Sequence, residues 1–169
     1  MVLLHSPPPS FDDPVEMLQA CHGKVRHFAG LAQRLAAHLN QHGADRQARE
    51  AAQSVLRYFD VAAPLHHADE DEDLYPALQA LNDPELNQAI AKLTAEHTEL
   101  GLLWQAVRRW LLRVQEGQAE LPPAELPAFA QRYPQHAADE EALVYPHAPR
   151  LRPELLAELG KNMAQRRQT

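Results

Sequence analysis

Two segments of this sequence repeat one another and constrain the fold more than any other feature. Residues 59–76 read FDVAAPLHHADEDEDLYP, and residues 129–146 read FAQRYPQHAADEEALVYP. At an offset of 70 positions they share eight of eighteen residues, and each copy has a histidine followed four residues later by a glutamate. In a helix, two such side chains lie about 40 degrees apart in direction, on one face. The repeat therefore predicts two helices that present the same polar pair.

A second repeat, at an offset of 75 positions, relates two longer apolar stripes. The first stripe is Val15, Leu18, Val25, Ala29, Ala32, Ala36 and Leu39, and the second is Ile90, Leu93, Leu100, Trp104, Val107, Leu111 and Val114. Steps of three and four residues are typical of the buried face of a helix. Each stripe has one gap, which His22 fills in the first and His97 in the second. Two further helices are predicted, each with a histidine on its buried face.

These patterns predict an all-α, up-down-up-down four-helix bundle with a short extra C-terminal helix. We expect a loose tail at 1–11, bundle helices at about 12–42, 45–75, 84–116 and 127–145, and the terminal helix at 153–167. Tyr-Pro pairs should end the second and fourth helices, because proline disfavours helix in the residue before it. Pro64 and Pro134 should kink those helices just before the repeated histidines. A chain of 169 residues is expected to form one domain.

The histidines and glutamates of the two repeats predict a metal site inside the bundle. An imidazole is a ligand of intermediate softness and a carboxylate can bridge two cations, so the set suits Fe or Mn better than Ca. One histidine from each helix, together with two carboxylates, predicts two metal ions. The six candidate ligands are His22, His66, Glu70, His97, His136 and Glu140.

This combination resembles the hemerythrin-like HHE cation-binding family, and the matching residues span nearly the whole chain. The resemblance implies a non-haem di-iron centre, with Mn or Zn as alternatives, in which Glu70 and Glu140 bridge the ions and an oxo or hydroxo group completes the bridge. One grouping of the terminal ligands is His22 with His66 and His97 with His136, although the sequence leaves the pairing open.

Two departures from that resemblance concern function. Oxygen-carrying hemerythrins have a second histidine one turn after the ligand of the third helix, where this chain has Gly101. Their fourth-helix carboxylate also lies five residues after its histidine, whereas Glu140 lies four after His136. Fewer histidine ligands imply open coordination positions, which O2, NO or peroxide can occupy.

The other residues around these motifs are expected to have structural roles. His67 and Asp71 also have four-residue spacing, but their repeat partners are Ala137 and Glu141, so we expect His67 beside the ligands or at the surface. The acidic run 69–73 should be a solvated face apart from Glu70. An alternative role for Asp69 and Asp139 is to orient a ligand histidine. We expect helix-end packing for Tyr75 and Tyr145, a small buried thiol for Cys21, and no ligand role for the remaining histidines, which are His5, His27, His38, His42 and His147.

Composition narrows the classes of partner. The formal charge is −7 and the basic residues are scattered among acids, so binding to nucleic acid is not expected. The sequence has no stretch suited to spanning a membrane and no signal-like start, and its single cysteine excludes an internal disulfide framework. We therefore expect a cytoplasmic protein.

Three functions remain open from sequence. The first is a protein that binds or senses O2, NO or iron at its di-iron centre. The second is an oxidase, peroxidase or reductase that acts on O2, peroxide or NO at the same centre, because access and surroundings set the chemistry of such a site. The third is a metal-free structural or interaction bundle.

Overall fold

The computed structural model describes residues 8–169, and within that range every regular element is a helix. The first bundle helix is α1 (Pro14–His42), the third is α5 (Pro84–Gln115) and the fourth is α6 (Leu126–Leu143). The second is a chain of consecutive segments: α2 (Arg46–Arg57), η1 (Tyr58–Ala62), α3 (Ala63–Ala68), η2 (Asp69–Leu74) and α4 (Tyr75–Gln79). A 3-10 segment, η3 (Tyr145–Arg150), then leads into α7 (Pro153–Arg166).

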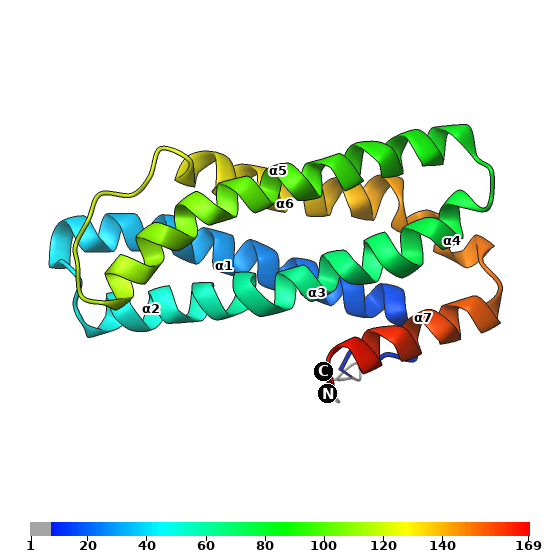
Figure 1. Ribbon diagram of the computed structural model, residues 1–169, viewed down its shortest axis with the longest axis horizontal. Helices are drawn as coiled ribbons and strands as arrows, with labels where there is room; N and C mark the ends of the chain where they lie inside the picture. Colours follow the sequence, from blue (N-terminus) through cyan, green and yellow to red (C-terminus); the bar gives the residue numbers. More distant parts are fainter. Residues whose placement is uncertain (1–7) are drawn as a thin grey trace, which may run out of the picture.

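The four long helices form an antiparallel bundle (Figure 1). α1 packs against α2 and α6, and α5 packs against the same two helices, so the predicted all-α bundle is confirmed. The predicted extra C-terminal helix is also present: α7 lies outside the bundle, against α1 and η2. Aspartate side chains accept hydrogen bonds from the first turns of α1, α2 and α5, and those of α1 and α5 precede a proline at the helix start.

The predicted end of the second helix at Tyr75 is wrong, because helical structure continues through Pro76 to Gln79. The reason lies in η2, a π-helical segment in which the N–H of Tyr75 bonds to the carbonyl of Glu70, five residues back. The ring of a proline collides with the carbonyl four residues before it in a regular α-helix. A wider π turn just before the proline relieves that collision, so the helix does not end. The fourth helix does end near its Tyr-Pro pair, at Leu143.

Pro64 and Pro134 differ in their local backbone, although they occupy equivalent positions in the repeat. The π segment η1 precedes Pro64, and the N–H of Ala63 bonds to the carbonyl of Tyr58. Pro134 lies inside α6, which is α-helical over its whole length. The local distortion predicted at both prolines is therefore present as a π turn only on the second helix.

The predicted loose tail is wrong at its last residue, while residues 1–7 lie outside the described part of the chain. Phe11 packs against the cluster of apolar residues beside α7, and the guanidinium of Arg167 lies 5.6 Å from the centre of its ring. The carbonyl oxygen of Phe11 approaches Gly160 so closely that a Cβ there would lie 2.0 Å from it. A glycine is needed where these two segments cross.

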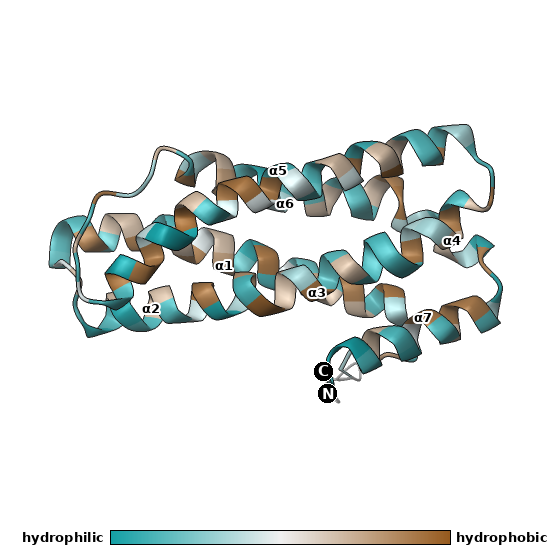
Figure 2. Cartoon of the chain, viewed as in Figure 1, coloured by the Kyte–Doolittle hydropathy of each residue, from teal (hydrophilic) through white to brown (hydrophobic). Residues whose placement is uncertain are grey.

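The interior consists of two hydrophobic clusters with a polar layer between them. The larger contains Val25 and Leu100, and the smaller contains Leu18 and Leu93. Hydrophobic and hydrophilic segments alternate along the helices in Figure 2, and every apolar position of the predicted stripe on α5 is buried. His22 and His97 lie on α1 and α5 where one cluster gives way to the other. No helix among residues 8–169 is both long and apolar enough to cross a membrane.

Candidate metal centre

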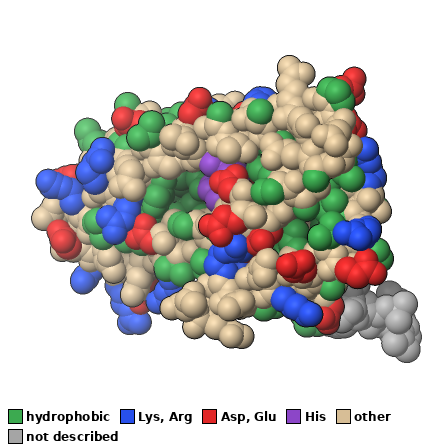
Figure 3. Space-filling model, turned by 45° about the vertical axis from the view of Figure 1, so that its right-hand side comes forward, with side chains coloured by type: hydrophobic (Ala, Val, Ile, Leu, Met, Phe, Trp, Pro, Cys, Tyr) green, Lys and Arg blue, Asp and Glu red, His purple; other side chains and the backbone are tan. Residues whose placement is uncertain are grey.

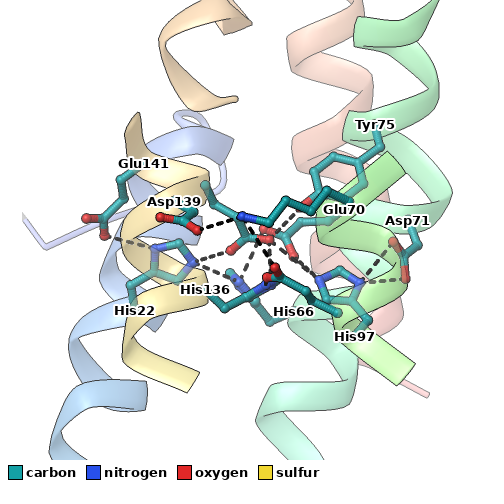
Figure 4. A network of polar contacts seen from close by, with 12 residues as sticks. His22, His66, Glu70, Asp71, Tyr75, His97, His136, Asp139 and Glu141 are labelled. Atoms are coloured by element: carbon teal, nitrogen blue, oxygen red, sulfur yellow. Dashed lines mark hydrogen bonds and ion pairs between the residues drawn. The ribbon is translucent and has the colours of Figure 1, made fainter. Parts of the chain in front are cut away.

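All six predicted ligands converge in the polar layer between the two clusters, as Figure 4 shows for most of them. Their exposed fractions run from 0% for Glu70 and Glu140 to 9% for His97. Each bundle helix supplies one histidine, and the second and fourth also supply the glutamates. The two repeats therefore place chemically similar side chains on opposite sides of one buried centre.

The glutamates lie between two pairs of histidines. His22 Nε2 is 3.1 Å from His66 Nε2 and 3.0 Å from Glu140 Oε2. His97 Nε2 is 3.5 Å from an oxygen of each glutamate. His136 Nε2 lies 3.0 Å from Glu140 Oε1, and the rings of His97 and His136 are 4.8 Å apart. The distances group His22 with His66 and His97 with His136, whereas the sequence left this pairing open.

Three of the four histidines have a carboxylate within hydrogen-bonding distance of Nδ1, the ring nitrogen that faces away from the centre. The Nδ1 atom of His22 lies 2.9 Å from Glu141, that of His97 lies 2.9 Å from Asp71, and that of His136 lies 2.9 Å from Glu96. A neutral imidazole with its proton on Nδ1 has its lone pair on Nε2, and these Nε2 atoms face the centre. Such carboxylate partners fix the orientation of metal-binding histidines.

The carboxylates that hold His22 and His97 are related by the first repeat. Asp71 and Glu141 are separated by the offset of 70 positions, and each reaches across to a histidine on a neighbouring helix. Sequence reasoning missed the role of both carboxylates, although they directly follow the repeated glutamates.

His66 is the one histidine of the four without such a carboxylate: its Nδ1 is buried without a hydrogen-bond partner. Under the second repeat the position equivalent to Glu96 is Cys21, so His66 lacks the acid that serves His136.

Neither Asp69 nor Asp139 orients a ligand histidine, the alternative that the sequence left open for them, and the solvated position expected for Asp69 is wrong. Asp69 is fully buried and accepts hydrogen bonds from Arg166 and Arg167 of the C-terminal segment, so it is not part of a solvated face. Asp139 binds Lys92 and Gln135 at the surface. Both side chains therefore point away from the centre, because they leave the helix about 100 degrees round from the ligand beside them.

Two tyrosines hold the glutamates, so the expectation that they merely pack at helix ends is also wrong. The hydroxyl of Tyr75 donates to Glu140 at 2.5 Å, and that of Tyr145 donates to Glu70 at 2.5 Å. Each tyrosine thus contacts the carboxylate of the other repeat copy. Burial raises the pKa of both tyrosines well above the usual value, so their hydroxyls remain protonated donors.

Burial and proximity separate the pKa values of the two glutamates. Burial and the nearby charge of Glu140 raise the pKa of Glu70 well above its usual value. Burial would also raise the pKa of Glu140, but the close imidazoles of His136, His22 and His97 outweigh it and hold the pKa well below the usual value. Burial lowers the pKa of His66 to about 3, whereas Asp71 and the glutamates overcome burial and raise that of His97 to about 11.

The donor atoms that face the centre fit a metal site. Among the described residues, Nε2 of His97 and His136 and Oε2 of both glutamates are buried without a hydrogen bond of acceptable geometry. An unpaired buried polar atom costs about 1–3 kcal/mol, and such groups are rare in folded proteins. Ligand atoms of His22, His66, Glu70 and Glu140 also lie within 4.8 Å of one another. Cations between these atoms would satisfy all of them at once.

His67 lies beside the ligands, which is one of the two positions expected for it from the sequence. Its ligand atom is within 4.8 Å of those of His97 and His136. Its ring, however, stacks on that of His97 at 4.0 Å with an angle of only 13° between the planes. Histidines that share one ion aim their lone pairs at the same point, whereas stacked parallel rings aim them side by side. We therefore conclude that His67 packs beside the ligands and is not one of them.

Known proteins resemble the chain over most of its length. The model of a family described as the hemerythrin HHE cation binding domain matches residues 13–148, which include all six candidate ligands. An uncharacterized protein of Haemophilus influenzae is 34% identical over 160 residues. That match covers 94% of this chain and 92% of the relative.

Proposed function

Because the chain belongs to the hemerythrin HHE cation-binding family, we propose that it holds two iron ions in the polar layer of its bundle and binds or senses O2, NO or iron there. The observation that carries the proposal is the set of buried donor atoms that face one another without aligned hydrogen bonds. A structural bundle with incidental histidines would gain nothing from these unpaired atoms, which destabilise it.

In this proposal each ion has two histidine ligands. His22 and His66 hold one ion, His97 and His136 hold the other, and Glu70 and Glu140 lie between the two. The contacts that support this division are the 3.1 Å approach of His22 to His66 and the equal distances of His97 from both glutamates. Two carboxylates also offset part of the charge of two cations, which a buried site requires.

The chemistry of the donor set suits iron or manganese. All six candidates offer nitrogen or oxygen, and none offers sulfur, so the set suits Fe or Mn and excludes a thiolate site. When bound, a reduced iron pair would supply electrons and open coordination positions to a small molecule. The protein would supply orientation, through Glu141, Asp71 and Glu96, and exclusion of water by burial.

A cytoplasmic location is part of the proposal. A single cysteine gives the chain no internal disulfide, which is usual for proteins of a reducing compartment.

The test is metal content per chain after anaerobic purification from iron-supplemented cells, followed by optical spectra before and after exposure to air or NO. We expect two irons per chain and a new visible band on exposure. His22→Ala and His97→Ala should each lower the iron content, and Glu70→Ala should lower it further. His27→Ala, an exposed histidine on the same helix as His22, is the matched control and should retain both irons. Wild-type protein that stays metal-free would contradict the proposal.

A further inference from the structure

The two halves of the centre also differ one helical turn after the histidines that the second repeat relates. Four residues after His22 stands Arg26, and four residues after His97 stands Gly101. Arg26 donates two hydrogen bonds to Glu141, the same carboxylate that holds His22, so it covers that half. A Cβ built on Gly101 meets nothing within 4 Å, which leaves the other half open beside His97.

A surface pocket of about 500 Å³ occupies the space beside Gly101. Its wall contains three aromatic side chains, Phe59, Trp104 and Tyr133, and its inner end is formed by His67 and His97. Figure 3 shows a hollow on this side of the molecule with histidine at its inner edge and acidic side chains beside it. The pocket therefore reaches a candidate ligand from the surface.

The size of this pocket exceeds what a diatomic gas requires. One water molecule takes about 30 Å³ of liquid, and O2 or NO is of similar size. Pockets of roughly 300–1,000 Å³ with apolar and aromatic walls are typical of sites for organic molecules. Asp71 and Glu72 add acceptor oxygens to the lining. Both already accept hydrogen bonds, from His97 and Arg166, but a carboxylate has further lone pairs.

We propose that the pocket beside Gly101 binds a small aromatic molecule carrying a hydrogen-bond donor, with its ring against Trp104 and Tyr133 and its donor toward the carboxylates. Binding requires only the pocket. The occupant would lie next to His97. That this places it next to a metal ion rests on the proposed function. Aromatic rings pack favourably against one another, and the two carboxylates disfavour an anionic occupant.

Phenol is the probe, and the indole N–H signals of the two tryptophans in a proton–nitrogen NMR spectrum are the readout. Trp104 lies in the pocket wall, whereas Trp110 does not line the pocket and donates to the carbonyl of Glu120, so it serves as an internal control. Phenol should shift the Trp104 signal saturably and leave that of Trp110 in place. Benzoate, which is anionic, should bind at least tenfold more weakly than phenol.

Gly101→Leu fills the pocket and should raise the dissociation constant of phenol at least tenfold. Gly23→Leu is the matched control: Gly23 is a helical glycine of α1 that also has open space around a built Cβ, and its substitution should change the constant less than twofold. If Gly101→Leu does not fold, Thr98→Phe, at an exposed position of the pocket lining, replaces it with the same expectation. Absence of saturable phenol binding, or equal binding by Gly101→Leu and wild type, overturns the proposal.

Phenol titrations of the full chain, first without metal and then after incubation with zinc, test the pocket and the metal centre separately. Zinc is used because it is diamagnetic. If the chain takes up no zinc but still binds phenol, the pocket is supported and the metal centre is contradicted. Full metal loading without phenol binding would overturn the pocket and leave the metal centre intact.

Discussion

The hydroxyl of Tyr145 donates a hydrogen bond to Glu70 at 2.5 Å, across 75 positions of the sequence. The reciprocal bond joins Tyr75 to Glu140 across 65 positions. Each copy of the repeated segment thus supplies a carboxylate and also the donor that holds the carboxylate of the other copy. The two copies depend on one another for the arrangement of the centre, so a change in either copy is expected to act on both.

Replacing Tyr145 by Phe should destabilise the metal-free protein by about 1–3 kcal/mol, because the buried oxygen of Glu70 loses its donor. Tyr75→Phe should act similarly through Glu140. Urea unfolding followed by circular dichroism measures both effects. Tyr58→Phe also removes a hydrogen bond of a buried tyrosine, to the carbonyl of Cys21, but this bond does not involve the glutamates. It is therefore the control for metal affinity, which chelator competition should find unchanged in this variant alone. Unchanged stability in both Tyr75→Phe and Tyr145→Phe would show that these bonds are unimportant.

The carboxylates behind the histidines should tune metal affinity without being ligands. Asp71→Asn and Glu141→Gln remove the charge behind His97 and His22 while keeping a similar shape. Loss of such a partner typically costs about 10–100-fold in affinity. Competition with a chelator measures the change in each variant. Glu99→Gln, at an exposed carboxylate paired with Arg132, is the control, and an equal loss in this variant would point to a non-specific charge effect.

The ligand positions could be predicted because they belong to the same periodicity that builds the helices. His22 and His97 fill gaps in apolar stripes, so the pattern that buries Leu18 and Leu93 also buries them. The repeat singled out His66 and Glu70 over the adjacent His67 and Asp71. Helix geometry places these two side chains on one face, and the apolar pattern turns that face inward.

The surroundings of the ligands could not be predicted in the same way, because they depend on contacts between helices. Asp71 holds a histidine on α5 and Tyr145 holds a glutamate on the second helix, and neither relation follows from spacing along one helix. The π segment before Pro76 escaped prediction because a proline normally marks a helix end. Asp69 was expected at the surface because its partners, Arg166 and Arg167, lie almost one hundred positions away.

The cap of α2 should make stability depend on pH. Asp45 accepts a hydrogen bond from the N–H of Ala48 at 2.8 Å and another from His38, and these bonds lower the pKa of Asp45 below its usual value. A lowered folded-state pKa contributes stability above the unfolded value of about 3.9, and this contribution is lost as pH falls through the folded pKa. Asp45→Asn keeps a capping side chain but cannot titrate. The gap between wild type and this variant in urea midpoint should be constant near neutral pH and shrink as pH falls below about 4, and a gap independent of pH would contradict the assignment.

The contact between the C-terminal segment and η2 should be the most sensitive ion pair of the described structure. Asp69 is fully buried, and Arg166 and Arg167 approach its oxygens at 2.5 and 2.6 Å. Replacing both arginines by Met leaves a buried charge uncompensated and should cost about 3–5 kcal/mol of unfolding free energy. Adding Asp69→Leu to that variant removes the stranded charge and should restore much of the loss, because an apolar replacement of a buried pair is often neutral. Arg132→Met, which breaks an exposed pair with Glu99, should cost less than about 1 kcal/mol. A similarly small loss in the double arginine variant would show that α7 is only loosely tied to the segment that carries Glu70.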